Sequence, residues 1–353
     1  MINAYAFVLG TTSWAHHARG FFHALDPLEP VALVALDTPQ NGSPHTPAFQ
    51  SMLQRTPDAA SPSIGLGPIE AMPDVKGLLR VGYIVWETTV MPQDKLKILN
   101  SMDVVWVPTH WGRSVLIDNG IPANKVHVVP EGVDANLFAP IERAPQCRFR
   151  FLCVGKWEER KGIVALIESF LAEFSSEEEV ELVLHCYNPY VYHFSLENEI
   201  LRKAGNRSSQ ILASSPTGQQ EMVQLYNSAD AFVLPTRAEG WGLPILEAMS
   251  CGLPVIVTNY SGPTDYLTEQ IAYPIPIEKL VHVYDPVFFA DGAALGEWAQ
   301  PDLSALKTLM RHVYENRAEA KRKGNLARAA VLAQWTWHHA ALKALASIRR
   351  EGI

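Results

Sequence analysis

The stretch "DAFVLPTRAEGWGLPILEAMSCGLPVIVTN" (residues 230–259) reads as strand, loop, helix and strand. The apolar runs at its two ends are continuous and rich in β-branched residues, a pattern typical of parallel strands that are buried on both faces. Gly240 and Gly242 favour a loop after the first apolar run. Pro244 then suits the first turn of a helix that ends before Gly252. The stretch therefore predicts part of a parallel α/β sheet, with Glu239 in the loop at a strand end and Glu247 about one turn into the helix.

Eight further apolar runs of the same kind alternate with helical patterns along the chain. They cover residues 4–10, 31–37, 80–86, 103–109, 125–132, 149–155, 180–187 and 209–214. The clearest helical pattern is 162–174, whose apolar residues fall on one stripe. This alternation predicts two doubly wound α/β units, with a boundary near 138–146, where prolines and charges interrupt it. Two stretches rich in proline, 38–73 and 273–301, are expected to be loops or irregular.

The composition narrows the class of protein. The 353 residues are 48% apolar and 19% charged, with a formal net charge of −8. Nucleic-acid binding needs a positive field, so it is not expected. The four cysteines include no C-x-x-C pair, which argues against a zinc clip or a redox pair. No apolar stretch approaches the ~20 residues of a membrane span, so a reduced, cytoplasmic protein is expected.

Several common motifs are missing from the sequence. No G-x-G-x-x-G follows the first strand and no G-x-x-x-x-G-K-[ST] occurs, so neither a dinucleotide-binding dehydrogenase nor a P-loop NTPase is supported. No Asp-x-Asp occurs, which favours a way of handling phosphates without a metal, because Mg²⁺ prefers such hard oxygen ligands. Adjacent helix residues do not share a face, so the His pairs at 16–17 and 338–339 are not expected to bind a metal.

Glu239 and Glu247 suit a ligand that is rich in hydroxyl groups. An ionised carboxylate only accepts hydrogen bonds, and it can accept two from a vicinal diol. In open α/β sheets, ligands bind at the carboxyl ends of the strands, where Glu239 is expected. The free N–H groups at the start of the following helix could bind an anion. The alternative is a solvated loop acid and a helix-surface acid.

A second candidate segment is "VGKWEERKG" (154–162), which follows a predicted strand and precedes a helix. Lys156 and Lys161 flank its turn, and cations beside a helix N-terminus suit a diphosphate. The alternative is a solvated charge run, because two glutamates and an arginine lie between the lysines.

Through these two segments, the sequence resembles a retaining glycosyltransferase of family 4, which has the GT-B fold. "EGWGLPILE" matches the E-x7-E motif of that family, "AMSCGLPVIVTN" its A-x-x-x-G-x-P-V-I run and "GKWEERKG" its donor-phosphate segment. The resemblance covers most of residues 80–350. It implies two Rossmann-like doubly wound domains that face each other across a cleft: an acceptor-binding domain (1–142) and a donor-binding domain (148–330). A C-terminal helix (331–353) would pack back toward the first domain.

The resemblance also implies roles for individual residues. Glu247 would bind the ribose hydroxyls of a nucleotide sugar, Glu239 would contact the transferred sugar, and Lys161 would neutralise the diphosphate leaving group. Glu239 and Lys161 are thus the catalytic candidates. The remaining donor-binding candidates are Gly10 and Thr11 after the first strand, Lys156, and the backbone of Gly240, Trp241, Gly242 and Leu243.

Two positions depart from the family. Lys156 stands where an arginine is usual, so a bidentate phosphate contact is lost there. "GYIVWETT" replaces a histidine-containing turn, and its Glu87 is either a contact to sugar or acceptor, or a surface acid.

The implied reaction moves a sugar from a UDP- or GDP-sugar to a hydroxyl acceptor, without a cofactor or metal. The acceptor would be a glycan, a lipid-linked intermediate or a small molecule, in the synthesis of polysaccharide, glycolipid or glycoconjugate. Peripheral contact with the inner membrane face stays open. The alternatives are a catalytically silent protein that binds nucleotide sugars, and a related epimerase or phosphorylase of the same fold.

Overall fold

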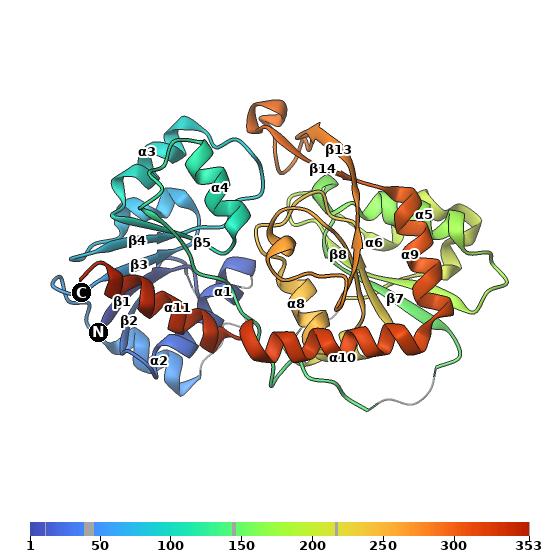
Figure 1. Cartoon of the computed structure of the whole chain (residues 1–353), viewed down its shortest axis with the longest axis horizontal. Coiled ribbons are helices and arrows are strands. Elements are labelled where there is room, and N and C mark those ends of the chain that lie inside the picture. The colour runs from blue at the N-terminus through green and yellow to red at the C-terminus, as the bar shows by residue number, and fades with distance from the viewer. Residues whose placement is uncertain (11, 39–45, 143–145, 216–217, 353) are drawn as a thin grey trace. The chain divides into compact units, whose positions relative to one another are not determined.

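The computed structural model describes residues 1–10, 12–38, 46–142, 146–215 and 218–352 (Figure 1). The contacts between residues divide the chain into two compact units. Unit 1 comprises residues 1–86, 90–134 and 334–353, and unit 2 comprises residues 87–89 and 135–333. Each unit is built around its own parallel sheet.

Unit 1 has a sheet of six parallel strands in the order β2-β1-β3-β4-β5-β6. The strands are β1 (Ile2–Ala6), β2 (Val31–Ala35), β3 (Ser63–Leu66), β4 (Arg80–Tyr83), β5 (Val104–Val107) and β6 (Val126–Val128). Its helices are α1 (Ser13–Leu25), α2 (Pro47–Gln54), α3 (Gln93–Ser101), α4 (His110–Asp118) and, from the end of the chain, α11 (Trp337–Arg350). Helix α11 packs on α1, and Ser347 accepts a hydrogen bond of 2.8 Å from the buried Trp106 indole.

Unit 2 has a second sheet of six parallel strands, in the order β12-β11-β10-β7-β8-β9. The strands are β7 (Phe149–Lys156), β8 (Val180–Tyr187), β9 (Ile211–Ala213), β10 (Ala231–Leu234), β11 (Val255–Thr258) and β12 (Tyr273–Ile275). The helices are α5 (Ile163–Glu173), α6 (Leu196–Ala204), α7 (Gln219–Asn227), α8 (Leu243–Ser250), α9 (Leu303–Glu315) and α10 (Arg317–Gln334). A separate antiparallel pair joins β13 (Ile277–His282) to β14 (Glu297–Pro301).

The predicted α/β class with two doubly wound sheets is confirmed, and every predicted strand is present. Two predicted loops are wrong. Residues 38–73 contain α2 and β3, and residues 273–301 contain β12, β13 and β14. Strand β3 is four residues long, lies between two prolines and includes Gly65. A Cβ there would lie 2.4 Å from the Val75 side chain, so close packing needs glycine where the pattern suggests a break.

His17 of the first His pair belongs to the core of unit 1. It lies on α1 and is 2% exposed, between the rings of Tyr83 (centroids 4.6 Å apart) and Trp337 (5.5 Å). Burial lowers its pKa to about 3, so the ring is neutral near pH 7. Among the described residues, no group of three or more His, Cys, Asp or Glu side chains is arranged to hold a metal ion.

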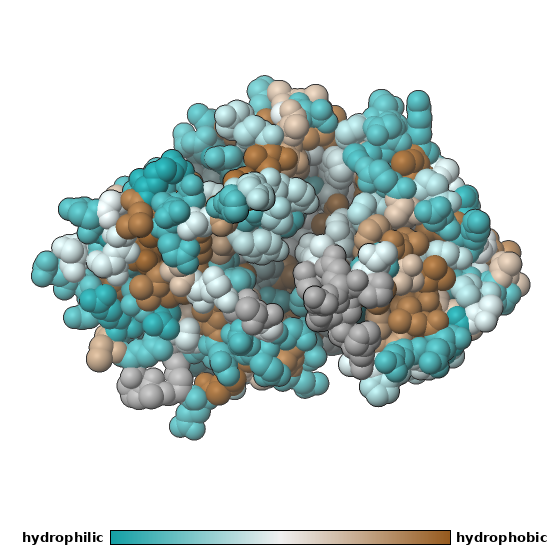
Figure 2. Space-filling view, turned by 180° about the vertical axis from the view of Figure 1, so that it is seen from behind, coloured by the Kyte–Doolittle hydropathy of each residue, from teal (hydrophilic) through white to brown (hydrophobic). Residues whose placement is uncertain are grey.

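Apolar residues on the face drawn in Figure 2 lie in separate patches among hydrophilic ones. None of the helices in the described part of the chain has both the length and the apolar content that a bilayer span requires.

Candidate functional site

The candidate site of unit 2 follows from the pairing of β7 with β10. The carboxyl ends of parallel neighbours lie at the same edge of a sheet, so the loops that follow them meet. After β7, a short 3-10 turn (Glu159–Lys161) leads through Gly162 into α5. After β10, residues 235–242 lead into α8. This topology brings Lys161 and Glu239 together from positions 78 residues apart.

Lys161 and Glu239 form a buried ion pair. The Lys161 Nζ lies 2.7 Å and 2.9 Å from the two carboxylate oxygens of Glu239, and Thr236 Oγ1 donates to the same carboxylate at 2.9 Å. Lys161 is 7% exposed and Glu239 is 3% exposed. Burial raises the pKa of Glu239, but Lys161, Arg160 and Thr236 together lower it by a larger amount. The pKa of Glu239 is therefore below its usual value. Glu239 is therefore an ionised carboxylate near pH 7.

The backbone fastens the two loops to each other. The N–H of Arg237 donates to the Arg160 carbonyl at 2.6 Å, and the Thr236 hydroxyl donates to the same carbonyl at 3.1 Å. Gly162 has a φ of +67°, and a Cβ there would lie 2.2 Å from the Pro235 carbonyl oxygen. Only glycine allows this approach, so the start of α5 is fixed against the end of β10.

The segment Gly240–Leu243 forms the turn into α8. Gly242 has a φ of +99° and is the N-cap, so no side chain caps the first N–H groups of the helix. The Trp241 side chain is 1% exposed and packs on Tyr266, whose hydroxyl donates to the Trp241 carbonyl at 2.7 Å. The indole therefore anchors the turn in the core. The expected approach of this backbone to a ligand stays a prediction.

Glu247 lies in a different environment from Glu239. It is half-buried on α8, and its Oε2 accepts a hydrogen bond of 2.6 Å from the Tyr226 hydroxyl of α7. Burial raises the pKa of Glu247 to about 7, although the hydrogen bond from Tyr226 opposes the rise. Near neutral pH this carboxyl therefore exists in both its protonated and its ionised form.

The other predicted residues lie in three places. Lys156 ends β7, and its Nζ lies 5.5 Å from the centroid of the Phe288 ring. Glu87 groups with unit 2, where its Oε1 lies 3.1 Å from the Arg160 Nη1. Gly10 belongs to unit 1, and its N–H donates to Asp37 at 2.7 Å. Thr11 lies outside the described residues.

Sequence reasoning missed Arg160 and Glu158, which the alternative interpretation placed in a solvated charge run. The structure corrects that interpretation. Arg160 is 4% exposed and Glu158 is 8% exposed, whereas Glu159 between them faces solvent. The partners of Arg160 come from distant parts of the sequence, so no local pattern reveals its burial. Tyr226 was also missed, because it continues the apolar pattern of α7.

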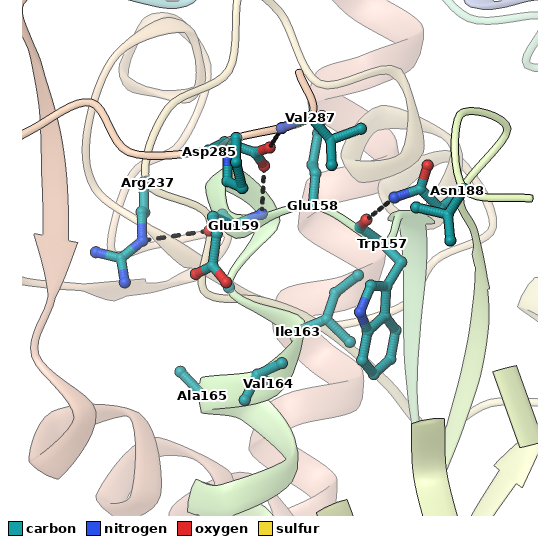
Figure 3. Close-up of a pocket in the computed structure, with 13 residues that line it drawn as sticks. Trp157, Glu158, Glu159, Ile163, Val164, Ala165, Asn188, Arg237, Asp285 and Val287 are labelled. Carbon is teal, nitrogen blue, oxygen red and sulfur yellow. Dashed lines mark hydrogen bonds between the residues drawn. The ribbon is translucent and has the colours of Figure 1, made fainter. Parts of the chain in front are cut away.

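A pocket of about 230 Å³ lies beside the 157–162 loop, at the N-terminus of α5 (Figure 3). Its polar side chains hold that loop in place. Asp285 accepts from the Glu159 N–H at 3.0 Å, Asn188 donates to the Trp157 carbonyl at 3.0 Å, and Arg237 donates to the Glu159 carbonyl at 3.2 Å. The loop that presents Arg160 and Lys161 is thus fixed from a second side.

The region that contains this site matches a known family. Residues 148–293 match the family model for glycosyl transferases group 1. This match agrees with the resemblance that the E-x7-E and donor-phosphate motifs predict, and Lys161 and Glu239 both lie within the matched segment.

Two curated relatives align with part of the chain. Mannosylfructose-phosphate synthase of Agrobacterium fabrum is 30% identical over 184 residues, which are 48% of this chain and 40% of that protein. A probable sucrose-phosphate synthase of Thermosipho melanesiensis is 34% identical over 151 residues, which are 41% of this chain and 34% of that protein. The chain thus spans less than half the length of either relative.

Solved structures match the whole chain in fold. Sucrose-phosphate synthase of Thermosynechococcus elongatus superposes with a TM-score of 0.74 at 16% identity, over 99% of this chain and 98% of that one. HepE of Anabaena, in complex with UDP and glucose, gives 0.69 at 12% identity, over 99% of each chain. These matches confirm the GT-B fold class, and the segment that matches the family model lies in unit 2.

Proposed function

We propose that the protein is a glycosyltransferase that moves a sugar from a nucleotide sugar to a hydroxyl acceptor, with retention at the anomeric carbon and without a metal ion. The observation that carries the proposal is the buried pair of Lys161 and Glu239 at the strand ends of the matched segment. The curated relatives are named as synthases of sugar phosphates, and HepE was solved with UDP and glucose, which supports a nucleotide-sugar donor. Both UDP- and GDP-sugars fit the proposal.

The roles follow from charge and hydrogen-bonding capacity. Lys161 would move from the Glu239 carboxylate to the diphosphate and stabilise the charge that grows there as the bond to the sugar breaks. The released Glu239 carboxylate would then accept hydrogen bonds from sugar hydroxyls. Glu247 would do the same for the ribose. The N-terminus of α8, which has no side-chain cap, would face the anionic part of the donor.

The proposed transfer needs no nucleophile from the protein. The bond between the anomeric carbon and the phosphate oxygen breaks through an oxocarbenium-like transition state, and the acceptor oxygen bonds to the same face of the carbon. The acceptor proton passes to the leaving phosphate, so atoms and charge balance. Lys161 is the cation that stabilises the products of this step.

A thermal-shift screen with UDP, GDP and ADP, and with their sugars, would identify the base. Turnover of the sugar that binds is then measured by NMR in EDTA, with Glu239→Gln as the inactive control. We expect transfer or slow donor hydrolysis to persist in EDTA, with the α configuration of an α-linked donor kept. Loss of all turnover on chelation would contradict the metal-free reaction. Binding without any turnover would favour a silent binding protein instead.

A further inference from the structure

Arg160 makes contacts that the proposed roles do not use. Its guanidinium lies next to three carboxylates: Nη1 is 3.1 Å from Glu87 and 3.3 Å from Glu239, and Nη2 is 2.5 Å from Glu158. With Lys161, these residues form a charge cluster of two cations and three carboxylates (Glu87, Glu158, Arg160, Lys161 and Glu239). Arg160 contacts all three acids, whereas Lys161 forms its ion pair with Glu239.

The charge of Arg160 favours the ionised form of the carboxylates around it. A carboxylate that is removed from water without a partner is unstable and takes up a proton. Burial lowers the pKa of Arg160, but Glu158, Glu87 and Glu239 raise it by more, so the guanidinium stays charged. A guanidinium is planar and offers several donors in fixed directions, which suits contact with several acceptors at once.

Arg160 is also fastened to the loop that carries Glu239. Its Nη1 donates to the Ala238 carbonyl at 2.6 Å, one residue before Glu239. Its own carbonyl accepts from the Arg237 N–H and the Thr236 hydroxyl of the same loop. Both the backbone and the side chain of Arg160 therefore determine where the Glu239 carboxylate lies.

The contact with Glu87 fixes a further segment. Residues 87–89 group with unit 2, although the chain on both sides of them belongs to unit 1. The contacts that anchor this segment include the ion pair of Glu87 with Arg160, and the Thr89 hydroxyl oxygen, which accepts from the Glu297 N–H at 2.8 Å. Arg160 thus links Glu87 to Glu239 through a single side chain.

We propose that Arg160 is a positioning residue of the transfer reaction, which holds the carboxylates of Glu239 and Glu87 in fixed places for the sugar that is transferred. This inference rests on the proposed function. Arg160 acts through Glu239 and Glu87, because its Nη1 and Nη2 already contact protein acceptors. The ammonium of Lys161, in contrast, contacts Glu239 in the described part of the chain, and it is the group that would move to the diphosphate.

The test compares Arg160→Lys, Arg160→Met and the matched pair Glu158→Gln and Glu159→Gln. For each protein, kcat and KM for the nucleotide sugar are measured, together with the Kd of the product nucleotide. A lysine offers a point charge and not a planar fork. We therefore expect Arg160→Lys to lower kcat by about ten- to a hundredfold, as a displaced positioning group does, with product nucleotide binding unchanged. Arg160→Met should lower kcat further, and Glu159→Gln, whose side chain faces solvent, should match the parent.

An unchanged kcat in Arg160→Lys would overturn the inference. So would a loss of nucleotide affinity and of thermal stability in proportion to the loss of kcat, because that pattern marks a purely structural role. Glu158→Gln should lower kcat while Glu159→Gln does not, and equal behaviour of the two would also overturn it.

A second measurement does not depend on turnover. A double-mutant cycle of Arg160→Met and Glu87→Gln on denaturant unfolding reports whether the two residues interact. Non-additive effects support the link between them, and additive effects overturn it. A parent protein that turns over none of the donors contradicts the proposed function, and the cycle then decides alone whether Arg160 holds Glu87.

Discussion

The loop after β1 in unit 1 and the loop after β7 in unit 2 begin at equivalent strand ends but satisfy their polar groups differently. After β1, the N–H groups of Val8, Leu9 and Gly10 all donate to the carboxylate of Asp37, at 2.7 to 3.0 Å. The loop after β7 instead supplies the side chains of Lys161 and Arg160 to Glu239 of the loop after β10, and Thr236 of that second loop also donates to Glu239.

The difference concerns which contacts a ligand could replace. The backbone N–H groups cannot leave Asp37 unless the loop changes its conformation. The Asp37 carboxylate therefore occupies the N–H groups that an anionic ligand would otherwise bind. Arg19 supports this arrangement, since it donates to the carbonyls of Val8 and Gly10 at 2.9 and 2.7 Å. Lys161 has rotatable bonds and can exchange one anion for another. Unit 2 thus holds its acid with a rotatable lysine, whereas unit 1 holds its acid with backbone N–H groups.

The strongest test of this comparison removes the exchangeable cation. Lys161→Met should reduce turnover of the nucleotide sugar by about 100- to 1000-fold, the usual effect of losing one group that stabilises transition-state charge. Lys156→Met is the matched control, because this lysine ends the same strand but lies over the Phe288 ring. We expect a smaller loss for Lys156→Met. Equal losses in steady-state assays would mean that the ion pair with Glu239 has no special role.

The sequence predicted much of this arrangement, for physical reasons. Strands β7 and β10 appear as continuous apolar runs because both of their faces are buried, and parallel pairing then places the loops that follow them at one edge. The nearness of Lys161 and Glu239 follows from that logic. The short strand β3 was not predicted, because its prolines and Gly65 resemble a turn signal.

What the sequence could not show depends on contacts between distant residues. "EERK" has the composition of a solvated turn, and the burial of Arg160 results from Glu87, Ala238 and Glu239. In the sequence, Tyr226 resembles any apolar position of an amphipathic helix. Its role becomes visible only in the structure, where its hydroxyl on α7 donates a hydrogen bond to Glu247 on α8. Local pattern thus predicted most of the elements and the strand ends at the site, while the polar network required the tertiary structure.

The fixed charge in unit 1 can be tested through stability. In Asp37→Ala the N–H groups of Val8, Leu9 and Gly10 lose their acceptor, so the free energy of unfolding should fall by about 1–3 kcal/mol. Asp94→Ala, at an exposed position on α3, serves as the control and should change it by less than about 0.5 kcal/mol. Denaturant unfolding measures both. A stable Asp37→Ala protein would show that water replaces the carboxylate at little cost, and that the carboxylate is not what fixes the first loop.

The pH dependence of donor binding tests Glu247. Because its pKa is raised to about 7, the ionised acceptor form is lost as the pH falls through that value. If the carboxylate binds the ribose, affinity should weaken by about tenfold from pH 8 to pH 6. Calorimetry with a nucleotide sugar suits the test, since its diphosphate is esterified at both ends. Glu247→Gln should bind more weakly with no such slope. A parent protein without the slope would argue against the ribose contact.

Tyr226→Phe should have the smallest effect and gives the most specific information about this second acid. The substitution removes one hydroxyl and keeps the ring, which packs edge-on to Phe138 with centroids 5.8 Å apart. Loss of a hydrogen bond of this kind costs about 0.5–1.5 kcal/mol, so donor affinity should fall only a few-fold at pH 8.

The pH profile of Tyr226→Phe carries the sharper information. The Tyr226 hydroxyl lowers the pKa of Glu247, so its removal should move the midpoint of donor binding to higher pH. In a Glu247→Gln background, Tyr226→Phe should leave the profile flat, because no carboxyl remains to titrate. A midpoint that stays in place would mean that burial alone controls this acid. A midpoint that shifts would show that the neutral Tyr226 hydroxyl controls the pKa of Glu247. Side-chain contacts in unit 2 would then control two acids, one through an ion pair and one through a hydroxyl, whereas Asp37 of unit 1 accepts from backbone N–H groups.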